Sequence, residues 1–170
     1  MNPMQQIEIE KVTLNIGCGG NLEKIEKAKK LLQKLTAQKP CVTLSKKRST
    51  FGIARGKPVG VKVTLRGKKA LEFLKKALAA IDNKLSANNF DKEGNFSFGI
   101  KEYIEIPGVK YDPEIGILGM DVCVTLKRKG YRIKYRRIQK RKIPKKHRIT
   151  KVEAMEWVEK NLGVKIDGAI

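Results

Sequence analysis

Two segments, residues 7–16 and 61–66, alternate apolar and polar side chains, and no other feature constrains the fold of this chain as much. A period of two predicts strands with one buried face and one open face. The apolar set comprises Val12, Leu14, Ile16, Val61, Val63 and Leu65. The polar set comprises Lys11, Thr13, Asn15, Lys62, Thr64 and Arg66. Both strands therefore belong to a sheet that is covered on one side only.

Three segments carry apolar residues at the spacing of a helix with one buried face. The first follows the N-cap residue Asn21 and ends before Pro40, the second spans 68–85, and the third begins at a capping box of Thr150 and Glu153 and ends at Gly163. The expected buried stripes are Leu22, Ile25, Ala28, Leu32 and Leu35; Leu71, Leu74, Leu78, Ile81 and Leu85; and Val152, Met155, Val158 and Leu162.

The remaining segments are short strands and loops. Strands are expected at 41–45, 96–106, 120–126 and 131–138, the last two as a hairpin around Lys129 and Gly130. Residues 46–60, KKRSTFGIARGKPVG, hold too much glycine and charge for a regular element and are expected to form a long mobile basic loop. This order of elements favours an α+β fold, a mainly antiparallel sheet with helices packed on one face. We expect one domain spanning 1–170, because 170 residues with 41% hydrophobic content can fill one core.

Positive charge is concentrated in two stretches. The chain has 38 Lys and Arg against 17 Asp and Glu, a net charge of +21. Between Glu26 and Glu72, and again between Asp121 and Glu153, there are 14 basic residues and no acidic one, so the rest of the chain is net acidic. A generally basic surface would interleave both signs. The pattern indicates a surface for a polyanion, either nucleic acid or an anionic membrane.

Catalytic and metal chemistry find little support. His147 is the only histidine and lies among lysines, so a nucleophilic triad and a histidine-rich metal site are nearly excluded. No CxxC pair exists, and Cys18, Cys41 and Cys123 are expected to be reduced and mostly buried. We therefore expect no enzyme activity, no metal and no cofactor.

Two motifs have both a structural and a functional interpretation. The glycines of residues 17–20 lack a dinucleotide fingerprint because position 22 is Leu, which favours a tight strand-to-helix turn over a phosphate contact. Phe96 and Phe98 could stack on bases, but strand alternation places at least one of them in the core.

The sequence shows no apolar run of about 18 residues and no apolar signal core near its N-terminus. The basic tracts fall in loops and strands, not in an amphipathic helix that would lie on a membrane. The expectation is a cytosolic protein without a membrane partner.

Five segments, in order, resemble the family of ribosomal protein five of the large subunit. They are KVTLNIGCGG (11–20), QKPCVTLSKKRSTFGIARGKPVGVKVTLRG (38–67), FLKKAL (73–78), FDKEGNFSFGIKEYIEIPGVKYD (90–112) and ILGMDVCVTL (117–126), together about two thirds of the chain. The closing PKKHRITKVEAMEWVEKNLGV resembles the archaeal and eukaryotic branch, and the short N-terminus favours an archaeon.

The resemblance implies that the sheet and adjacent loops hold a loop of 5S rRNA and dock it into the central protuberance, beside large-subunit rRNA and other 5S rRNA-binding proteins. The family's RNA contacts then fall on Asn15, Gln38, Phe51 and Thr64. Asn15 and Thr64 already lie on the predicted polar strand faces. Lys62 and Arg66 share that face and are expected to contact RNA phosphates.

The resemblance also implies a long loop that approaches the tRNA in the peptidyl site. It corresponds to 48–58 here, with Arg48, Ser49, Thr50, Arg55 and Lys57 as the candidate residues. A bridge to small-subunit protein thirteen is implied without assignable residues. The C-terminal extension at 140–170 receives no role.

Two other functions stay open on the sequence alone. A basic architectural protein would prefer duplex DNA with little structural selectivity, whereas the family requires folded RNA. An RNA-modifying enzyme would need a cofactor pocket or an acid–base cluster, which the sequence does not show.

Overall fold

A five-stranded antiparallel sheet forms the centre of the molecule, in the strand order β2-β3-β1-β6-β5. The computed structural model describes residues 2–50 and 52–168. The strands are β1 (Ile7–Gly17), β2 (Cys41–Leu44), β3 (Pro58–Leu65), β5 (Phe96–Ile100) and β6 (Met120–Arg128). The predicted α+β class is confirmed, and the alternation of β1 and β3 holds, since Val12, Leu14 and Val61 are fully buried.

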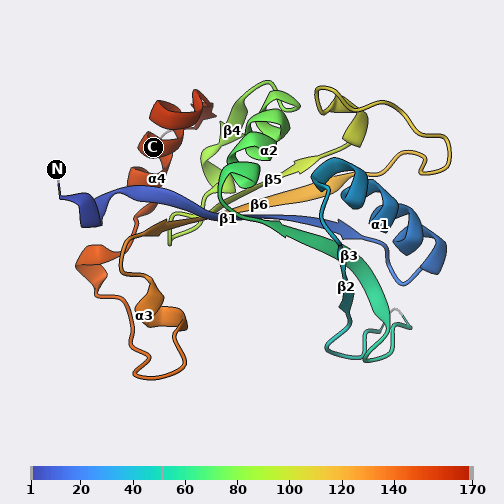
Figure 1. Ribbon diagram of the computed structural model, residues 1–170, viewed down its shortest axis with the longest axis horizontal. Helices are drawn as coiled ribbons and strands as arrows, with labels where there is room; N and C mark the ends of the chain where they lie inside the picture. Colours follow the sequence, from blue (N-terminus) through green and yellow to red (C-terminus); the bar gives the residue numbers. More distant parts are fainter. Residues whose placement is uncertain (1, 51, 169–170) are drawn as a thin grey trace.

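Three helices cover one face of this sheet (Figure 1): α1 (Leu22–Thr36), α2 (Lys68–Ala79) and α4 (Lys151–Leu162). The predicted caps are present, because the Asn21 side chain accepts hydrogen bonds from the N–H groups of Glu23 and Lys24, and Thr150 and Glu153 form the capping box. Each helix places apolar residues in the common core: Ile25, Ala28, Leu31 and Leu32; Ala70, Phe73, Leu74, Ala77 and Leu78; Ala154, Met155 and Val158.

The predicted stripes extend too far at their margins. Leu22 is 65% exposed, Leu71 40% and Val152 46%, so these three residues lie beside the packed face and not in it. Helix α2 also ends at Ala79, six residues earlier than expected, because Asp82 and Asn83 adopt left-handed backbone angles. That turn leads into β4 (Lys84–Ser86), which pairs in parallel with β7 (Lys165–Asp167) in a second, two-stranded sheet that the sequence did not reveal.

The strand expected at 131–138 is wrong. Residues Arg132–Tyr135 form a single helical turn, α3, and β5 already pairs with Met120–Val124 on the side of β6 that β1 leaves open. Strand β1 pairs along one side of β6 and β5 along the other, and beyond β5 the side-chain Oδ1 of Asn95 accepts a hydrogen bond from the Leu126 N–H at 3.3 Å. The chain after Gly130 therefore leaves the sheet.

Two other boundaries move. The strand expected at 96–106 ends at Ile100, because the Tyr103 N–H bonds to the Leu118 carbonyl. The predicted basic loop at 46–60 ends at Lys57, since residues 58–60 already belong to β3. Short 3-10 helices complete the secondary structure: η1 (Pro3–Gln5), η2 (Ala87–Asn89), η3 (Tyr103–Glu105) and η4 (Lys145–His147).

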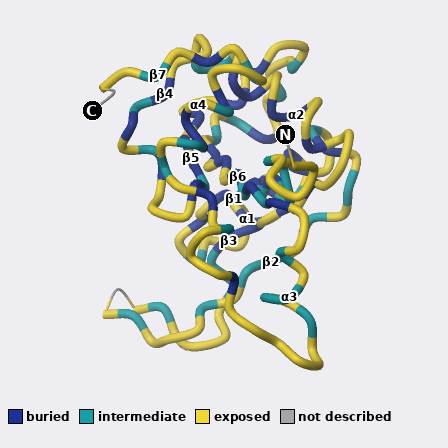
Figure 2. The backbone as a smooth tube through the Cα atoms, turned by 90° about the vertical axis from the view of Figure 1, so that its left-hand side faces the viewer, coloured by how far each residue is buried: buried dark blue, intermediate teal, exposed yellow. Residues whose placement is uncertain are grey.

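Two segments extend from the sheet on the side opposite the helices. We call residues 45–57 the first arm and residues 129–148 the second arm. In Figure 1 they descend at opposite ends of the sheet, and Figure 2 shows that both are mostly exposed. The uncovered sheet face thus lies between two arms.

Candidate nucleic-acid interface

The uncovered face of the sheet carries small polar side chains in register. We call its central set, Thr13, Asn15, Lys62, Thr64, Ser97, Gly99, Asp121 and Cys123, the open face. Asn15 lies opposite Lys62 on one side and Asp121 on the other, and Thr13 lies between Thr64 and Cys123. Neighbours across strands have Cβ atoms about 5 Å apart, so these groups form one continuous surface. Few of these side chains protrude far, which leaves the face accessible to a large flat partner.

Three predicted contact residues come together here. Asn15 is partly exposed, and Lys62 and Thr64 are exposed. Among the described residues, no hydrogen bond or ion pair links these side chains to the rest of the protein. Their hydrogen-bonding groups are therefore available to a ligand, as the alternation in the sequence predicted.

Arg66 lies at the margin of the open face, just after β3. Its Nη1 is 3.8 Å from Glu10 Oε1, while the other carboxylate oxygen of Glu10 is buried without a hydrogen-bond partner in the described part of the chain. Arg66 therefore forms a long ion pair with Glu10. Its side chain remains 61% exposed and can still approach a phosphate.

Gln38, another predicted contact, is not among the residues of the open face. Gln38 lies in the connection from α1 to β2, partly buried, where its N–H donates to Thr36 Oγ1 at 3.4 Å. It precedes β2, the edge strand in which Cys41 pairs with Lys62 of the open face. Phe51 lies outside the described residues.

The first arm holds the residues that were predicted near tRNA. Its base continues the β2–β3 pairing, because the Ser45 N–H bonds to the Lys57 carbonyl and the Gly56 N–H to the Ser45 carbonyl. Farther out, the Ser49 N–H bonds to the Ile53 carbonyl. Arg48, Thr50, Arg55 and Lys57 are exposed, and Ser49 is partly exposed. The sequence of the arm contains five basic residues and no acidic one.

The second arm is the larger concentration of charge, with eleven Lys and Arg and no Asp or Glu. Tyr131 anchors it, since its hydroxyl donates to the His147 carbonyl and accepts from the Ile149 N–H. Burial of the phenol raises the pKa of Tyr131, so it stays neutral near pH 7. The predicted density of charge is present, but it lies on an arm instead of on a hairpin.

Sequence reasoning missed several members of the open face. Cys41 and Cys123 were expected to be mostly buried, but both are exposed and only Cys18 is buried. Cys123 belongs to the open face because it alternates with core residues of β6, a signal that the apolar context of the strand obscured.

Phe96 and Phe98 are both buried, at 2% and 7% exposure, so neither can stack on bases.

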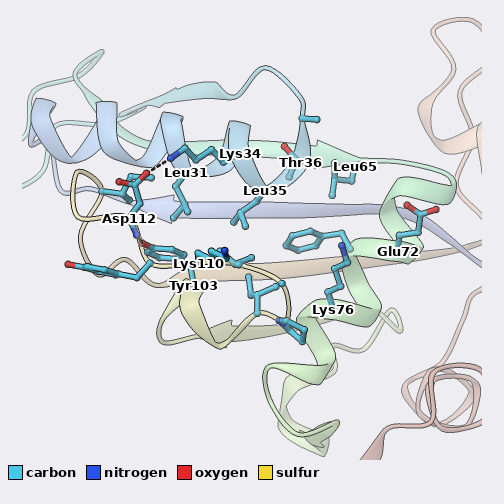
Figure 3. Close-up of a pocket in the computed structure, with 18 of the residues that line it drawn as sticks. Leu31, Lys34, Leu35, Thr36, Leu65, Glu72, Lys76, Tyr103, Lys110 and Asp112 are labelled. Carbon is cyan, nitrogen blue, oxygen red and sulfur yellow. Dashed lines mark hydrogen bonds and ion pairs between the residues drawn. The ribbon is translucent and has the colours of Figure 1, made fainter.

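A cavity of about 740 Å³ lies on the helix side, between α1, α2 and the segment that follows η3. Figure 3 shows Lys34 on α1 in contact with Asp112 across its rim. Their hydrogen bond raises the pKa of Lys34 and lowers that of Asp112. The cavity is on the far side of the sheet from the open face, so it contributes nothing to that surface.

The described residues include no group of three or more His, Cys, Asp or Glu side chains placed to hold a metal ion. No helix in the described part of the chain is both long and apolar enough to cross a bilayer. The uncharged side chains of the open face can form hydrogen bonds, and its lysine can attract phosphates. None of its residues forms a nucleophile–base pair.

The sequence matches known proteins along nearly its whole length. Residues 2–53 match the family described as ribosomal protein L5, and residues 58–157 match the C-terminus of the same ribosomal family. The chain belongs to the ribosomal protein L5 family. The large ribosomal subunit protein uL5 of Sulfurisphaera tokodaii is 54% identical over 98% of this chain and 95% of its own length. The proteins of the same name from Methanosphaera stadtmanae and Nanoarchaeum equitans are 50% and 52% identical, over 98% and 97% of this chain and 100% and 98% of their own lengths.

Membership of the L5 family confirms the resemblance found in the sequence, including its archaeal type. It also confirms that the chain is a structural protein and not an enzyme. The two L5 family segments share one sheet, because β1 from the first lies between β3 and β6 from the second.

Proposed function

We propose that this protein binds 5S rRNA through the open face and its two flanking arms, and holds it in the central protuberance of the large subunit together with large-subunit rRNA. Family membership shows that the chain is a structural component of the large ribosomal subunit in the cytoplasm. The proposal of 5S rRNA binding rests on the open face, a polar sheet surface with free hydrogen-bonding groups between two acid-free basic arms.

On this surface, charged side chains contribute affinity and uncharged hydrogen-bonding side chains contribute selectivity. Lysines and arginines of the arms neutralise phosphates and release counterions, which gives affinity without selectivity. Asn15 and Thr64 are uncharged and can only select, by hydrogen bonds to base or sugar groups held at a fixed place. Both kinds of group face the same side of the molecule, as recognition of a folded RNA requires.

The first arm supports the second part of the proposal, contact with tRNA in the peptidyl site. Arg48, Arg55 and Lys57 are exposed on a segment that extends away from the sheet, so they can reach a second RNA while the open face is occupied. We also propose contacts with small-subunit protein thirteen and with other 5S rRNA-binding proteins, on the family resemblance alone.

Binding of the full chain to archaeal 5S rRNA tests the proposal. If about six phosphates are neutralised, the affinity should fall by roughly a thousandfold between 50 and 200 mM salt. An unrelated folded RNA of equal length and a random DNA duplex should bind more weakly at every salt concentration, and the protein should protect one defined region of 5S rRNA from chemical probing. Equal affinity for the DNA duplex would contradict selective binding of 5S rRNA.

A further inference from the structure

The open face contains one acidic side chain, Asp121, in the middle of a surface otherwise suited to a polyanion. Asp121 lies on β6 directly opposite Asn15 on β1 and Gly99 on β5. It is exposed, and within the described part of the chain no hydrogen bond or ion pair engages its carboxylate. A carboxylate repels phosphate, so its favourable direct contacts with RNA are with hydrogen-bond donors of a base or a ribose.

The surroundings of Asp121 leave room for a base. A shallow hollow of about 380 Å³ is lined by Asn15, Asp121, Gly17, Gly99 and Gly119, together with Ile100, Lys101 and Met120. Gly17 and Gly99 place no side chain on the face here. A methyl group added at Gly99 would meet only Asp121 Oδ1, at 3.7 Å. The carboxylate therefore borders an unfilled space that a base lifted out of its stack can enter.

We infer that this hollow binds an unpaired guanine of the RNA, read by Asp121 and Asn15. The inference rests on the proposed function and specifies which base of the bound RNA the open face recognises. Guanine is the only common base with two adjacent donors on its Watson–Crick edge, N1–H and N2–H, which match the two oxygens of one carboxylate. Its neighbouring O6 is an acceptor, and the Asn15 amide can donate to it.

The other bases fit this pair less well. Adenine and cytosine place a ring acceptor beside their amino group, so the second carboxylate oxygen would face a lone pair. Uracil has one imino donor between two carbonyl acceptors, with the same consequence. A site built for hydrogen bonds rejects ligands that leave its polar groups unpaired. Asp121 thus selects guanine and excludes a phosphate from the same place.

The replacement Asp121→Asn gives a test in which the two interpretations predict opposite signs. If Asp121 only repels RNA, removing its charge should strengthen binding to every RNA. If it reads guanine, Asp121→Asn should weaken binding to archaeal 5S rRNA by about tenfold, while binding to an unrelated RNA becomes tighter. Glu8→Gln is the matched control, because Glu8 is an exposed acid on β1 paired with Lys127 and lines neither this hollow nor the cavity on the helix side. It should strengthen binding to both RNAs.

Kethoxal, which modifies guanine at N1 and N2, identifies the base. The wild-type protein should protect one unpaired guanine, and Asp121→Asn should expose that guanine while protection of the RNA backbone from hydroxyl radicals persists. Inosine at that position lacks the N2 amino group and should cost the wild type about fivefold in affinity, and the variant less, because its single amide oxygen accepts only one of the two guanine donors. Tighter 5S rRNA binding by Asp121→Asn, as for Glu8→Gln, would overturn the guanine site alone. A wild-type protein without preference for 5S rRNA would overturn the proposed function and this inference with it.

Discussion

Arg128 at the end of β6 is 7% exposed, and its Nη2 donates to Oε1 of Glu153 in α4 at 2.8 Å. Its Nη1 lies 3.5 Å from the Arg148 carbonyl, so the side chain joins the sheet to the second arm and to the last helix. Arg128 follows the core-facing phase of β6, and the charge is therefore buried beneath α4 instead of facing solvent. One of the fourteen basic residues in its stretch thus has a structural role.

Glu153→Gln should destabilise the fold. Burial acts to raise the pKa of Glu153, but hydrogen bonds from Thr150 and Arg128 hold it below its usual value. Its stabilising effect is therefore complete above the ordinary glutamate pKa of about 4.3 and is lost as the pH falls through the lowered folded value. At pH 7 the variant should lose about 1.5 kcal/mol, the lower end for hydrogen bonds to charged groups, since Glu153 is 43% exposed.

Urea unfolding at several pH values measures this effect. The difference between the wild type and Glu153→Gln should shrink as the pH is lowered from 5 toward 3, because the wild-type carboxylate is then protonated. Glu156→Gln on the exposed side of α4 is the control and should change stability little at any pH. A constant difference between wild type and Glu153→Gln across this range would contradict the ion pair.

The chain should unfold as one unit. Strand β1 lies between β3 and β6 and contributes Val12, Leu14 and Ile16 to the core. A fragment of residues 58–157 lacks this strand and should show no cooperative thermal transition, whereas the full chain should show a single one by circular dichroism and by Trp157 fluorescence. Two separate transitions in the full chain would indicate two domains.

The first arm should act on tRNA and not on folding. The double replacement of Arg48 and Arg55 by Gln removes two exposed charges without touching the hydrogen bonds at the base of the arm. Its melting temperature should match that of the wild type, 5S rRNA affinity should fall severalfold at most, and ribosomes assembled with it should retain peptidyl-site tRNA less well. Lys68→Gln with Lys75→Gln, on exposed positions of α2, is the matched change and should leave tRNA retention intact.

The cysteines provide a footprint of the open face. In the free protein Cys41 and Cys123 should react with a maleimide, and Cys18 should not, because it is buried. Burial and the nearby Asp121 raise the pKa of Cys123, so its reaction should be slower than that of a free thiol. Bound 5S rRNA should protect Cys123, which lies opposite Thr13 in the register of the sheet. Unchanged reactivity of Cys123 in the complex would place the RNA elsewhere.

Local periodicity predicted much of this fold, because single elements are fixed by contacts within a few residues. The alternation of β1 and β3, the caps at Asn21 and Thr150, and the polar phase of Asn15, Lys62 and Thr64 all required only the neighbouring sequence. The hairpin at 131–138 failed because strand pairing is a property of the whole sheet, and both sides of β6 are already engaged.

The candidate site was foreseen in part for the same reason. Positions on one strand follow from alternation, but their neighbours across strands do not. Asp121 and Lys62 flank Asn15 because of the register among β3, β1 and β6. Asp121 is more than a hundred residues away from Asn15 along the chain, so the neighbouring sequence does not predict this pairing. The burial of Arg128 depends on the position of α4 and was equally hidden.

The most direct measurement compares the salt dependence of 5S rRNA binding for Asn15→Ala, Thr64→Ala and Lys62→Ala. The first two remove hydrogen bonds but no charge, so each should cost about 1 to 2 kcal/mol of binding free energy with the salt slope unchanged. Lys62→Ala should weaken binding to all RNAs and flatten the slope by nearly one unit. If Asn15→Ala and Thr64→Ala both keep full affinity and full discrimination against unrelated RNA, the open face is not the 5S rRNA site.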